Sequence, residues 1–207
     1  MDSAPSPPGL PKPARITAAL IALAAFAALG VQITINAEAD ISPLAAAGLL
    51  LRYFTIWGNL AAAILMLHLA RGGYVRADIM AALSTALVII AVVYWALLSG
   101  YHHPVGFDRV TNQFHHTIVP AATIGWWMAF SDKVASIPRA LATIMAGPLI
   151  YTAFALVVGA VSGFYPYFFL DRSMLSWGEI ALYQAGLAAF FAMTGAALIA
   201  VKRLIRS

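Results

Sequence analysis

Six apolar runs, each near the length of a membrane-crossing helix, follow one another along the chain and limit what it can fold into. A helix rises about 1.5 Å per residue, so about 20 apolar residues cross a hydrocarbon layer of roughly 30 Å. The chain is 62% hydrophobic and 10% charged, whereas a soluble domain averages about 45–50% apolar and about 25% charged residues. The sequence therefore predicts an all-α, polytopic integral membrane protein. Its six predicted spans are residues 15–35, 44–70, 77–98, 112–130, 139–162 and 177–201.

Basic residues divide the connections into two sets, and this division predicts how the bundle is oriented. The first set comprises the N-terminal tail, the second-to-third connection, the fourth-to-fifth connection and the C-terminus. It carries Lys12, Arg15, Arg71, Arg76, Lys133, Arg139, Lys202, Arg203 and Arg206. The other three connections contain Arg109 and Arg172 as their only basic residues. Because cytoplasmic connections are enriched in Lys and Arg, the sequence predicts that both termini are cytoplasmic.

Composition also bounds the domain organisation and the classes of partner. Residues 1–14 are rich in proline and are predicted to form a flexible tail. A single six-helix transmembrane domain over residues 15–203 follows. The apolar run 16–35 exceeds the roughly 7–15 residues of a signal-peptide core, so we expect a retained first helix. The net charge is +4, but the basic residues lie at segment ends, where lipid headgroups explain them better than nucleic acid. The chain has no cysteine, which excludes disulfides and thiolate metal sites.

Arg52 is an ionisable residue inside the second predicted span. An arginine at the centre of a bilayer helix costs about 2.5–3.5 kcal/mol on insertion scales, so such a charge usually faces a cavity or a partner. Thr55 and Asn59 follow it at spacings of three and seven residues, which places all three side chains on one side of a continuous helix. The simpler interpretation is that Thr55 donates to its own helix backbone and that Arg52 pairs with an acidic residue.

The fourth predicted span opens with a second polar group. Asn112, His116 and Thr123 share a helix face, while His115 points about 100° away. The two histidines are alternatively an interfacial pair that meets lipid headgroups. Thr55 lies about 17 Å, and His116 about 6 Å, below the predicted outer ends of their spans. Contact between these two residues therefore requires tilt, a recessed fourth helix or a shallower start of the second span.

The histidines raise the question of a bound haem or metal. A haem with two histidine ligands is disfavoured because His68 and His116 are predicted near opposite sides of the membrane. A zinc site needs three or four converging ligands. The available ones are His102, His103 and one of His115 and His116. We therefore expect no cofactor and no metal, and a haem or metal protein is the third-ranked interpretation.

Three motifs occur in order along most of the chain. They are Arg52-Tyr53-Phe54-Thr55 with Asn59, then Asn112 with His116 and Pro120, and finally Tyr165-Pro166-Tyr167-Phe168-Phe169-Leu170-Asp171. Together they resemble the androgen-induced, ADTRP-type family of polytopic membrane proteins, in particular its bacterial members. The resemblance implies an integral protein of the bacterial inner (plasma) membrane. It also implies an activity, since animal members are threonine hydrolases that cleave fatty acid esters of hydroxy fatty acids with an intramembrane Thr and a His.

The resemblance assigns the two central roles by motif. The nucleophile falls on Thr55, and the base falls on His116 by its spacing from Asn112 and Pro120, with His115 as the alternative base. A threonine hydroxyl needs an adjacent base, and a neutral histidine can take its proton and return it to the leaving alcohol. The chain is thus expected to be an intramembrane threonine hydrolase of lipid esters.

The candidates for binding the substrate or its oxyanion are four further residues, Arg52, Asn59, Asn112 and His115. Asn59 or Asn112 is expected to donate to the developing oxyanion, and Arg52 to bind a carboxylate of the lipid. The expected partners are a lipid ester substrate and the surrounding membrane lipids. The alternative function is a non-enzymatic carrier or channel for a small anion or lipid, with Arg52 as the selectivity charge.

Overall fold

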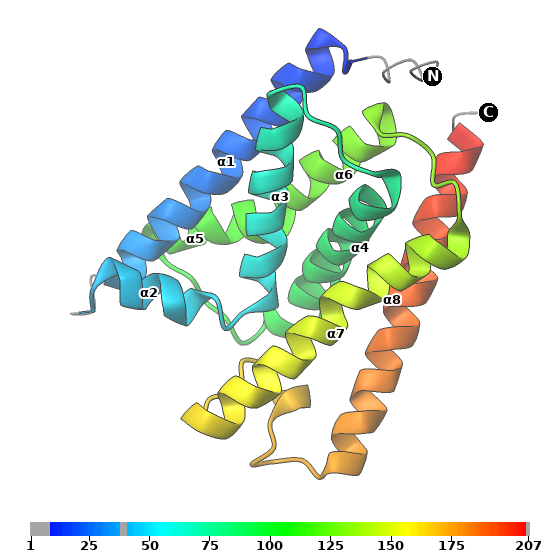
Figure 1. Cartoon of the computed structure of the whole chain (residues 1–207). Helices are drawn as coiled ribbons and strands as arrows, with labels where there is room; N and C mark the ends of the chain where they lie inside the picture. Colours follow the sequence, from blue (N-terminus) through cyan, green and yellow to red (C-terminus); the bar gives the residue numbers. More distant parts are fainter. Residues whose placement is uncertain (1–8, 38–40, 206–207) are drawn as a thin grey trace, which may run out of the picture.

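The computed structural model describes residues 9–37 and 41–205, and this part of the chain is built from helices without any strand (Figure 1). The α-helices are α1 (Lys12–Ala37), α2 (Pro43–Leu50), α3 (Phe54–Ala70), α4 (Ala77–Val93), α5 (Gly106–Gln113), α6 (Val119–Phe130), α7 (Ile137–Ser162) and α8 (Trp177–Ile205). Shorter elements between them are two π-helical turns, η1 (Tyr94–Leu98) and η2 (Phe114–Ile118), and a 3₁₀ turn, η3 (Phe168–Leu170). The predicted all-α class is confirmed.

Several helices have the length and composition of membrane spans. In the described residues, α1, α4 together with η1, α7 and α8 are long and apolar enough to cross a bilayer. The bent pair of α2 and α3 adds a fifth span if it is taken as one. These helices support an integral membrane protein. Helix α1 begins at Lys12, inside the stretch predicted as a tail, and residues 1–8 of that tail lie outside the described residues.

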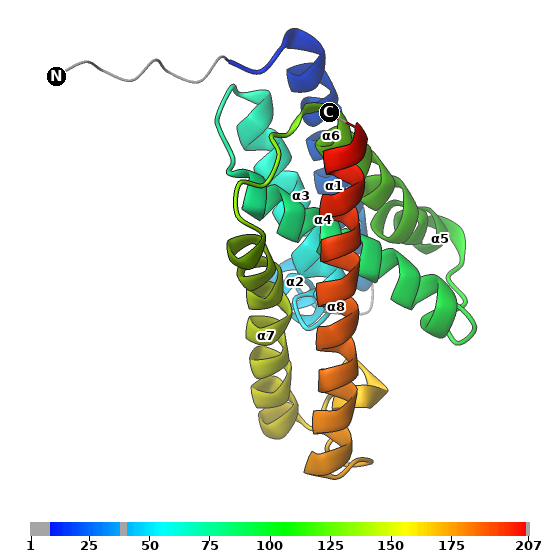
Figure 2. The same cartoon turned by 90° about the vertical axis from the view of Figure 1, so that its right-hand side faces the viewer.

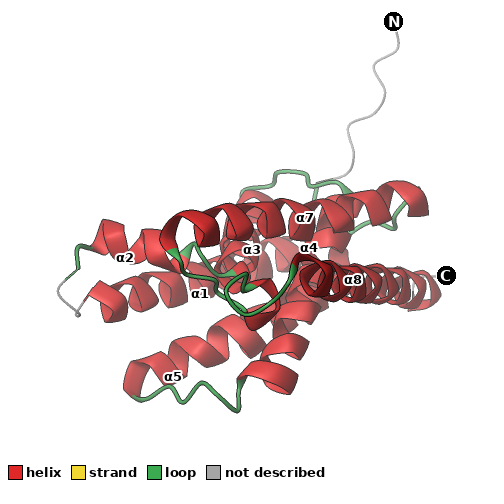
Figure 3. Ribbon diagram, turned by 90° about the horizontal axis from the view of Figure 1, so that it is seen from below, coloured by secondary structure: helices red, strands yellow, loops and turns green. Residues whose placement is uncertain are grey.

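Helix α4 lies at the centre of the bundle. It packs against α3, α6, α7 and α8. On one side α1 packs along α3, and on the other α7 and α8 run next to each other (Figures 1 and 2). Seen from below, α1, α2 and α5 lie on one side of the molecule and α8 on the other (Figure 3). The start of α1 and the end of α8 lie at the same end of the bundle, the top in Figure 1.

The second predicted span is not a continuous helix. Its two parts, α2 and α3, are bent by 105° relative to each other, and residues 51–53 form the break between them. Arg52 therefore lies in the break and not on the face of α3 that carries Thr55 and Asn59. The prediction that these three side chains share one helix face is wrong.

Aromatic side chains bond the backbone groups that the break frees. The hydroxyl of Tyr151, on α7, donates to the carbonyl of Arg52 at 2.6 Å. The indole of Trp57 donates to the carbonyl of Leu51 at 2.7 Å. An unpaired backbone group in a bilayer costs several kcal/mol, so non-helical backbone is tolerated only where protein groups bond it. These contacts explain how the helix can end within the membrane domain.

The fourth predicted span lies in a longer helical run, residues 106–130, made of α5, η2 and α6. This run is not among the helices that are apolar enough to be candidate spans, because His115, His116 and their polar neighbours interrupt its hydrophobic sequence. In η2 the amide of Val119 donates to the carbonyl of Phe114, five residues back. Such π-helical turns are rare and often occur at functional sites.

Glycines let α3 and α8 approach the neighbouring helices closely. A Cβ at Gly58 of α3 would overlap the side chain of Ile90 on α4. A Cβ at Gly195 of α8 would lie 2.6 Å from Ile144 Cδ1 and 3.3 Å from Thr85 Oγ1. Small residues at helix contacts are typical of membrane bundles, where close packing replaces the hydrophobic effect between helices. These close contacts hold α3 against α4, and α8 against α4 and α7.

Candidate functional site

Thr55 is the second residue of α3, and its hydroxyl faces the imidazole of His116 on η2. Thr55 Oγ1 and His116 Nε2 are 3.4 Å apart, and His116 Nδ1 lies 3.1 Å from the carbonyl oxygen of Asn112. A carbonyl oxygen only accepts, so Nδ1 carries the proton and Nε2 is the acceptor for the Thr55 hydroxyl. The separation of 3.4 Å is long for a hydrogen bond, as is common in catalytic pairs before substrate binds.

Tyr94 holds the other face of the His116 ring. The two rings are stacked, with centroids 3.7 Å apart and planes 15° from parallel. Tyr94 begins η1, so the stack joins two π-helical turns. The hydroxyl of Tyr94 lies 3.1 Å from Nδ1 of His102, whose Nε2 lies 3.8 Å from the carboxylate of Asp108. Gln32 of α1 donates to that carboxylate at 3.0 Å. The stack and the polar contacts of the Tyr94 hydroxyl thus link the His116 ring to α5 and α1.

Tyr167 belongs to the site, although the sequence did not single it out. Its hydroxyl oxygen accepts the amide of Phe54 at 3.1 Å, at the positive N-terminal end of α3, and it also interacts with the side chain of Thr55. Burial raises the pKa of Tyr167 above its ordinary value, against the opposing interactions with Thr55 and Phe54. The phenol therefore keeps its proton at neutral pH. The one available signal was its place in the aromatic run of residues 165–171.

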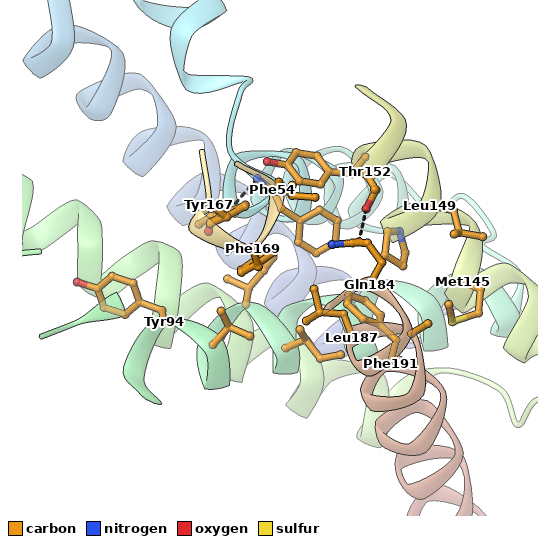
Figure 4. Close-up of a pocket in the computed structure, with 18 of the residues that line it drawn as sticks. Phe54, Tyr94, Met145, Leu149, Thr152, Tyr167, Phe169, Gln184, Leu187 and Phe191 are labelled. Carbon is orange, nitrogen blue, oxygen red and sulfur yellow. Dashed lines mark hydrogen bonds between the residues drawn. The ribbon is translucent and has the colours of Figure 1, made fainter. Parts of the chain in front are cut away.

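Two cavities meet at Thr55. The first has a volume of about 820 Å³ and is lined mostly by apolar residues of α4, α7 and α8 (Figure 4). We call it the apolar chamber, and its wall includes Ile89, Val93, Met145, Leu149, Leu187 and Phe191. Thr55, Tyr94 and Tyr167 also line this chamber. An acyl chain can therefore reach the Thr55 hydroxyl through hydrocarbon surroundings.

The second cavity lies on the side of Thr55 that faces α1 and α5. It has a volume of about 1160 Å³, and we call it the polar chamber. Its wall includes Gln32, Asn36, His102, Asp108, Asn112, His115 and His116. Thr55, Tyr94, Leu98 and Tyr167 line both chambers. The dyad of Thr55 and His116 thus stands where an apolar and a polar compartment join.

Asn112 and His115, both predicted as site residues, line the polar chamber. They are 5% and 3% exposed. The Asn112 Oδ1 atom and both ring nitrogens of His115 have no hydrogen-bond partner within the described residues. A buried polar atom without a partner carries a desolvation cost that a bound polar molecule can relieve. Of the two adjacent histidines, His116 is the one whose ring reaches Thr55.

Asn59 and Arg52, the other two predicted site residues, have different surroundings. The Asn59 amide nitrogen donates to the carbonyls of Thr55, at 2.9 Å, and His115, at 3.0 Å. Asn59 thus ties α3 to η2 and leaves no amide hydrogen for an oxyanion. The Arg52 guanidinium lies over the ring of Phe164, 5.1 Å from its centroid. Arg52 is absent from the residues that line the two chambers.

The histidine of α3 lies apart from this site. His68 is near the end of α3 opposite Thr55, and its Nε2 is 3.3 Å from the carbonyl of Tyr74. Among the residues that the structure describes, no group of three or more His, Cys, Asp and Glu could hold a metal ion.

Comparisons with protein-family models, with curated proteins and with solved structures find no match for this chain. The family resemblance and the roles that it implies for Thr55 and His116 stay predictions.

Proposed function

We propose that this protein is an integral membrane hydrolase of lipid esters, with Thr55 as nucleophile and His116 as base. The observation that carries the proposal is the Thr55–His116 contact of 3.4 Å at the junction of an apolar and a polar chamber. A hydroxyl beside a neutral imidazole is the pair that nucleophilic ester cleavage needs. Its setting suits a substrate that is part hydrocarbon and part polar.

The reaction begins when the Thr55 hydroxyl attacks the ester carbonyl and its proton passes to His116 Nε2. The tetrahedral intermediate then collapses, the bond from carbon to the alcohol oxygen breaks, and His116 returns the proton to that oxygen. Water then attacks the resulting acyl-threonine and gives a proton to His116. The bond from the acyl carbon to Thr55 Oγ1 breaks, His116 returns the proton to that oxygen, and the fatty acid leaves. The Asn112 carbonyl keeps Nδ1 protonated, so Nε2 stays in its basic form.

Tyr167 supplies the hydrogen bond to the oxyanion in this proposal. The Phe54 amide donates to the Tyr167 oxygen, and the Tyr167 hydroxyl also interacts with the side chains of Thr55 and Tyr151. In this proposal its hydrogen turns to the oxyanion when the substrate binds. Tyr167 lines both chambers next to Thr55, where a carbonyl under attack must lie. The positive end of α3 adds a favourable field for the same negative charge. Asn59 is excluded from this role by its two backbone bonds.

The two chambers bind different parts of the substrate. The acyl chain occupies the apolar chamber, and the leaving alcohol and the hydrolytic water occupy the polar chamber. There the unpartnered atoms of His115 and Asn112 are available to bond hydroxyl groups. A neutral polar molecule in this chamber gains hydrogen bonds with these buried atoms.

The proposed topology has six spans and two cytoplasmic termini in the bacterial inner membrane. It counts the bent pair of α2 and α3 and the helical run 106–130 as spans beside the four long apolar helices. An even number of spans agrees with the start of α1 and the end of α8 lying at one end of the bundle (Figure 1). Tyr101 and His102, from a connection assigned to the outer face, line the polar chamber, which therefore opens outward.

Turnover of fluorogenic fatty acyl esters by the purified protein in detergent micelles tests this function. Thr55→Ala and His116→Ala are each expected to lower kcat/KM by at least about a thousandfold. Thr34→Ala is the matched control, because the Thr34 hydroxyl bonds only the carbonyl of Val31 in its own helix. Wild-type turnover in both site variants would show that the assignment is wrong. Anion flux in liposomes that falls with Arg52→Gln, without ester cleavage, would favour the carrier.

A further inference from the structure

A polar pair interrupts the wall of the apolar chamber away from the dyad. Thr152 of α7 donates through Oγ1 to Gln184 Oε1 of α8 at 2.9 Å. Both residues line the chamber. Figure 4 places Tyr94 toward one side of this cavity and the Thr152–Gln184 pair toward the other. A substrate chain that starts at Thr55 therefore passes this pair further along its length.

The side-chain amide nitrogen of Gln184 donates no hydrogen bond to the described part of the chain. This Nε2 atom is buried. The bond from Thr152 holds the oxygen end of the amide and leaves the nitrogen end with two unused hydrogens. A donor left unpaired in hydrocarbon surroundings is unfavourable, whereas a ligand that offers an acceptor there gains a hydrogen bond. Plain hydrocarbon offers no acceptor.

The apolar chamber is accessible to lipid chains. Leu149 of α7 lines it and is 61% exposed, so the chamber extends to the side of the bundle that faces the bilayer core. Leu187 and Phe191 of α8 complete an apolar path past Gln184. A chain that enters laterally from the membrane meets mostly hydrocarbon until it reaches the Thr152–Gln184 pair and, beyond it, Thr55, Tyr94 and Tyr167.

We propose that the apolar chamber selects acyl chains that carry a hydroxyl group part-way along, at the position where its oxygen accepts a hydrogen bond from Gln184 Nε2. This inference rests on the proposed ester hydrolysis and names the class of acyl group that the enzyme prefers. The selected hydroxyl lies on the acyl side of the scissile bond and is separate from the alcohol that leaves. Gln184 determines specificity, and Thr152 positions its amide.

The test compares 4-methylumbelliferyl dodecanoate with the positional isomers of its hydroxydodecanoate ester. One isomer, or two adjacent ones, is expected to exceed the plain ester in kcat/KM by about fivefold, the worth of one net hydrogen bond. In Gln184→Leu that ratio falls to about one. Thr152→Val lowers the ratio, and Thr152→Ser, which keeps the hydroxyl, retains it. Leu182→Ala is the control on α8, since Leu182 is 75% exposed and its variant keeps the wild-type ratio.

A binding measurement decides the inference even if no ester is cleaved. The matching hydroxydodecanamide cannot be turned over as an ester and is expected to bind about fivefold more tightly than dodecanamide. The difference should appear as greater protection against thermal unfolding in the wild type and in Thr55→Ala, and disappear in Gln184→Leu. Equal binding of both amides, or a preference that survives Gln184→Leu, would overturn the role of Gln184. Loss of hydrolysis alone would count against the proposed function only.

Discussion

The ring of Tyr94 lies flat on the imidazole of His116, with the ring centroids 3.7 Å apart. Each residue belongs to a π-helical turn, η1 for Tyr94 and η2 for His116. The stack fixes the plane of the imidazole, and the Asn112 carbonyl fixes its tautomer. In the proposed hydrolase they would thus orient the His116 ring and set its tautomer, which are two of the roles of the carboxylate in a serine hydrolase triad.

Loss of the stacked ring is expected to lower turnover more than loss of the Tyr94 hydroxyl. Tyr94→Leu removes a ring contact worth about 0.5–1.5 kcal/mol and should reduce kcat by up to about tenfold. Tyr94→Phe keeps the stack, loses the contacts of the hydroxyl with His102 and with the Asn112 side chain, and should stay within about threefold of the wild type. Steady-state ester hydrolysis measures both. An equal loss of turnover in the two variants would show that the Tyr94 hydroxyl, and not the stacked ring, positions His116.

Tyr167→Phe is expected to lower kcat by about a hundredfold with little change in KM, because removal of one oxyanion donor acts on the transition state. The matched control is Tyr165→Phe in the same segment. Tyr165 packs against Gly159 and is not among the residues that line either chamber. A rise in KM with unchanged kcat for Tyr167→Phe would show that the phenol binds substrate without stabilising the transition state.

Gly159→Ala is expected to destabilise the protein by about 1–3 kcal/mol, the usual range for overpacking. A Cβ at Gly159 would overlap the ring of Tyr165, so the segment that carries Tyr167 must shift away from α7. Gly147 lies on the same helix, and a Cβ there would meet nothing within 4 Å. Thermal unfolding in detergent should therefore show a lower midpoint for Gly159→Ala than for the wild type, and no lower midpoint for Gly147→Ala. Equal midpoints for these two variants would contradict the packing argument.

Lys202→Met is expected to destabilise the protein by about 1–3 kcal/mol because it removes the ammonium hydrogen bonds to two carbonyls at a helix end. Lys202 is 2% exposed, and its ammonium donates to the carbonyls of Trp127, at 2.5 Å, and Met128, at 3.4 Å. These carbonyls lie near the C-terminus of α6, where a cation is favourable. Lys133→Met is the control, since Lys133 is exposed. A midpoint for Lys202→Met no lower than that of Lys133→Met would show that the buried ammonium is dispensable.

The apolar runs predicted the helices well because a bilayer allows the chain few other solutions. Helix α8 begins at Trp177 as predicted, and α1 begins at Lys12, three residues before the predicted start. The break at residues 51–53 was not predictable from local sequence, since Leu51-Arg52-Tyr53 contains no glycine or proline. It depends in part on a bond from Tyr151, about a hundred residues away in the chain.

The same break explains why the predicted depths of Thr55 and His116 differed. A continuous span from residue 44 places Thr55 deep in its helix, whereas α3 begins at Phe54 and Thr55 lies in its first turn. The motif resemblance selected the two side chains that the structure brings together. It could not select Tyr94 or Gln184, because their roles depend on contacts with distant helices. A single polar residue in an apolar run does not indicate which distant helix it contacts.

The most direct test of the central claim is labelling of the purified protein with a fluorophosphonate probe, followed by peptide mass spectrometry. A Thr55 hydroxyl activated by His116 predicts one probe adduct on Thr55, lost in Thr55→Ala, strongly reduced in His116→Ala and retained in Thr34→Ala. Labelling at another residue, or an adduct on Thr55 that forms equally well in His116→Ala, would contradict the dyad.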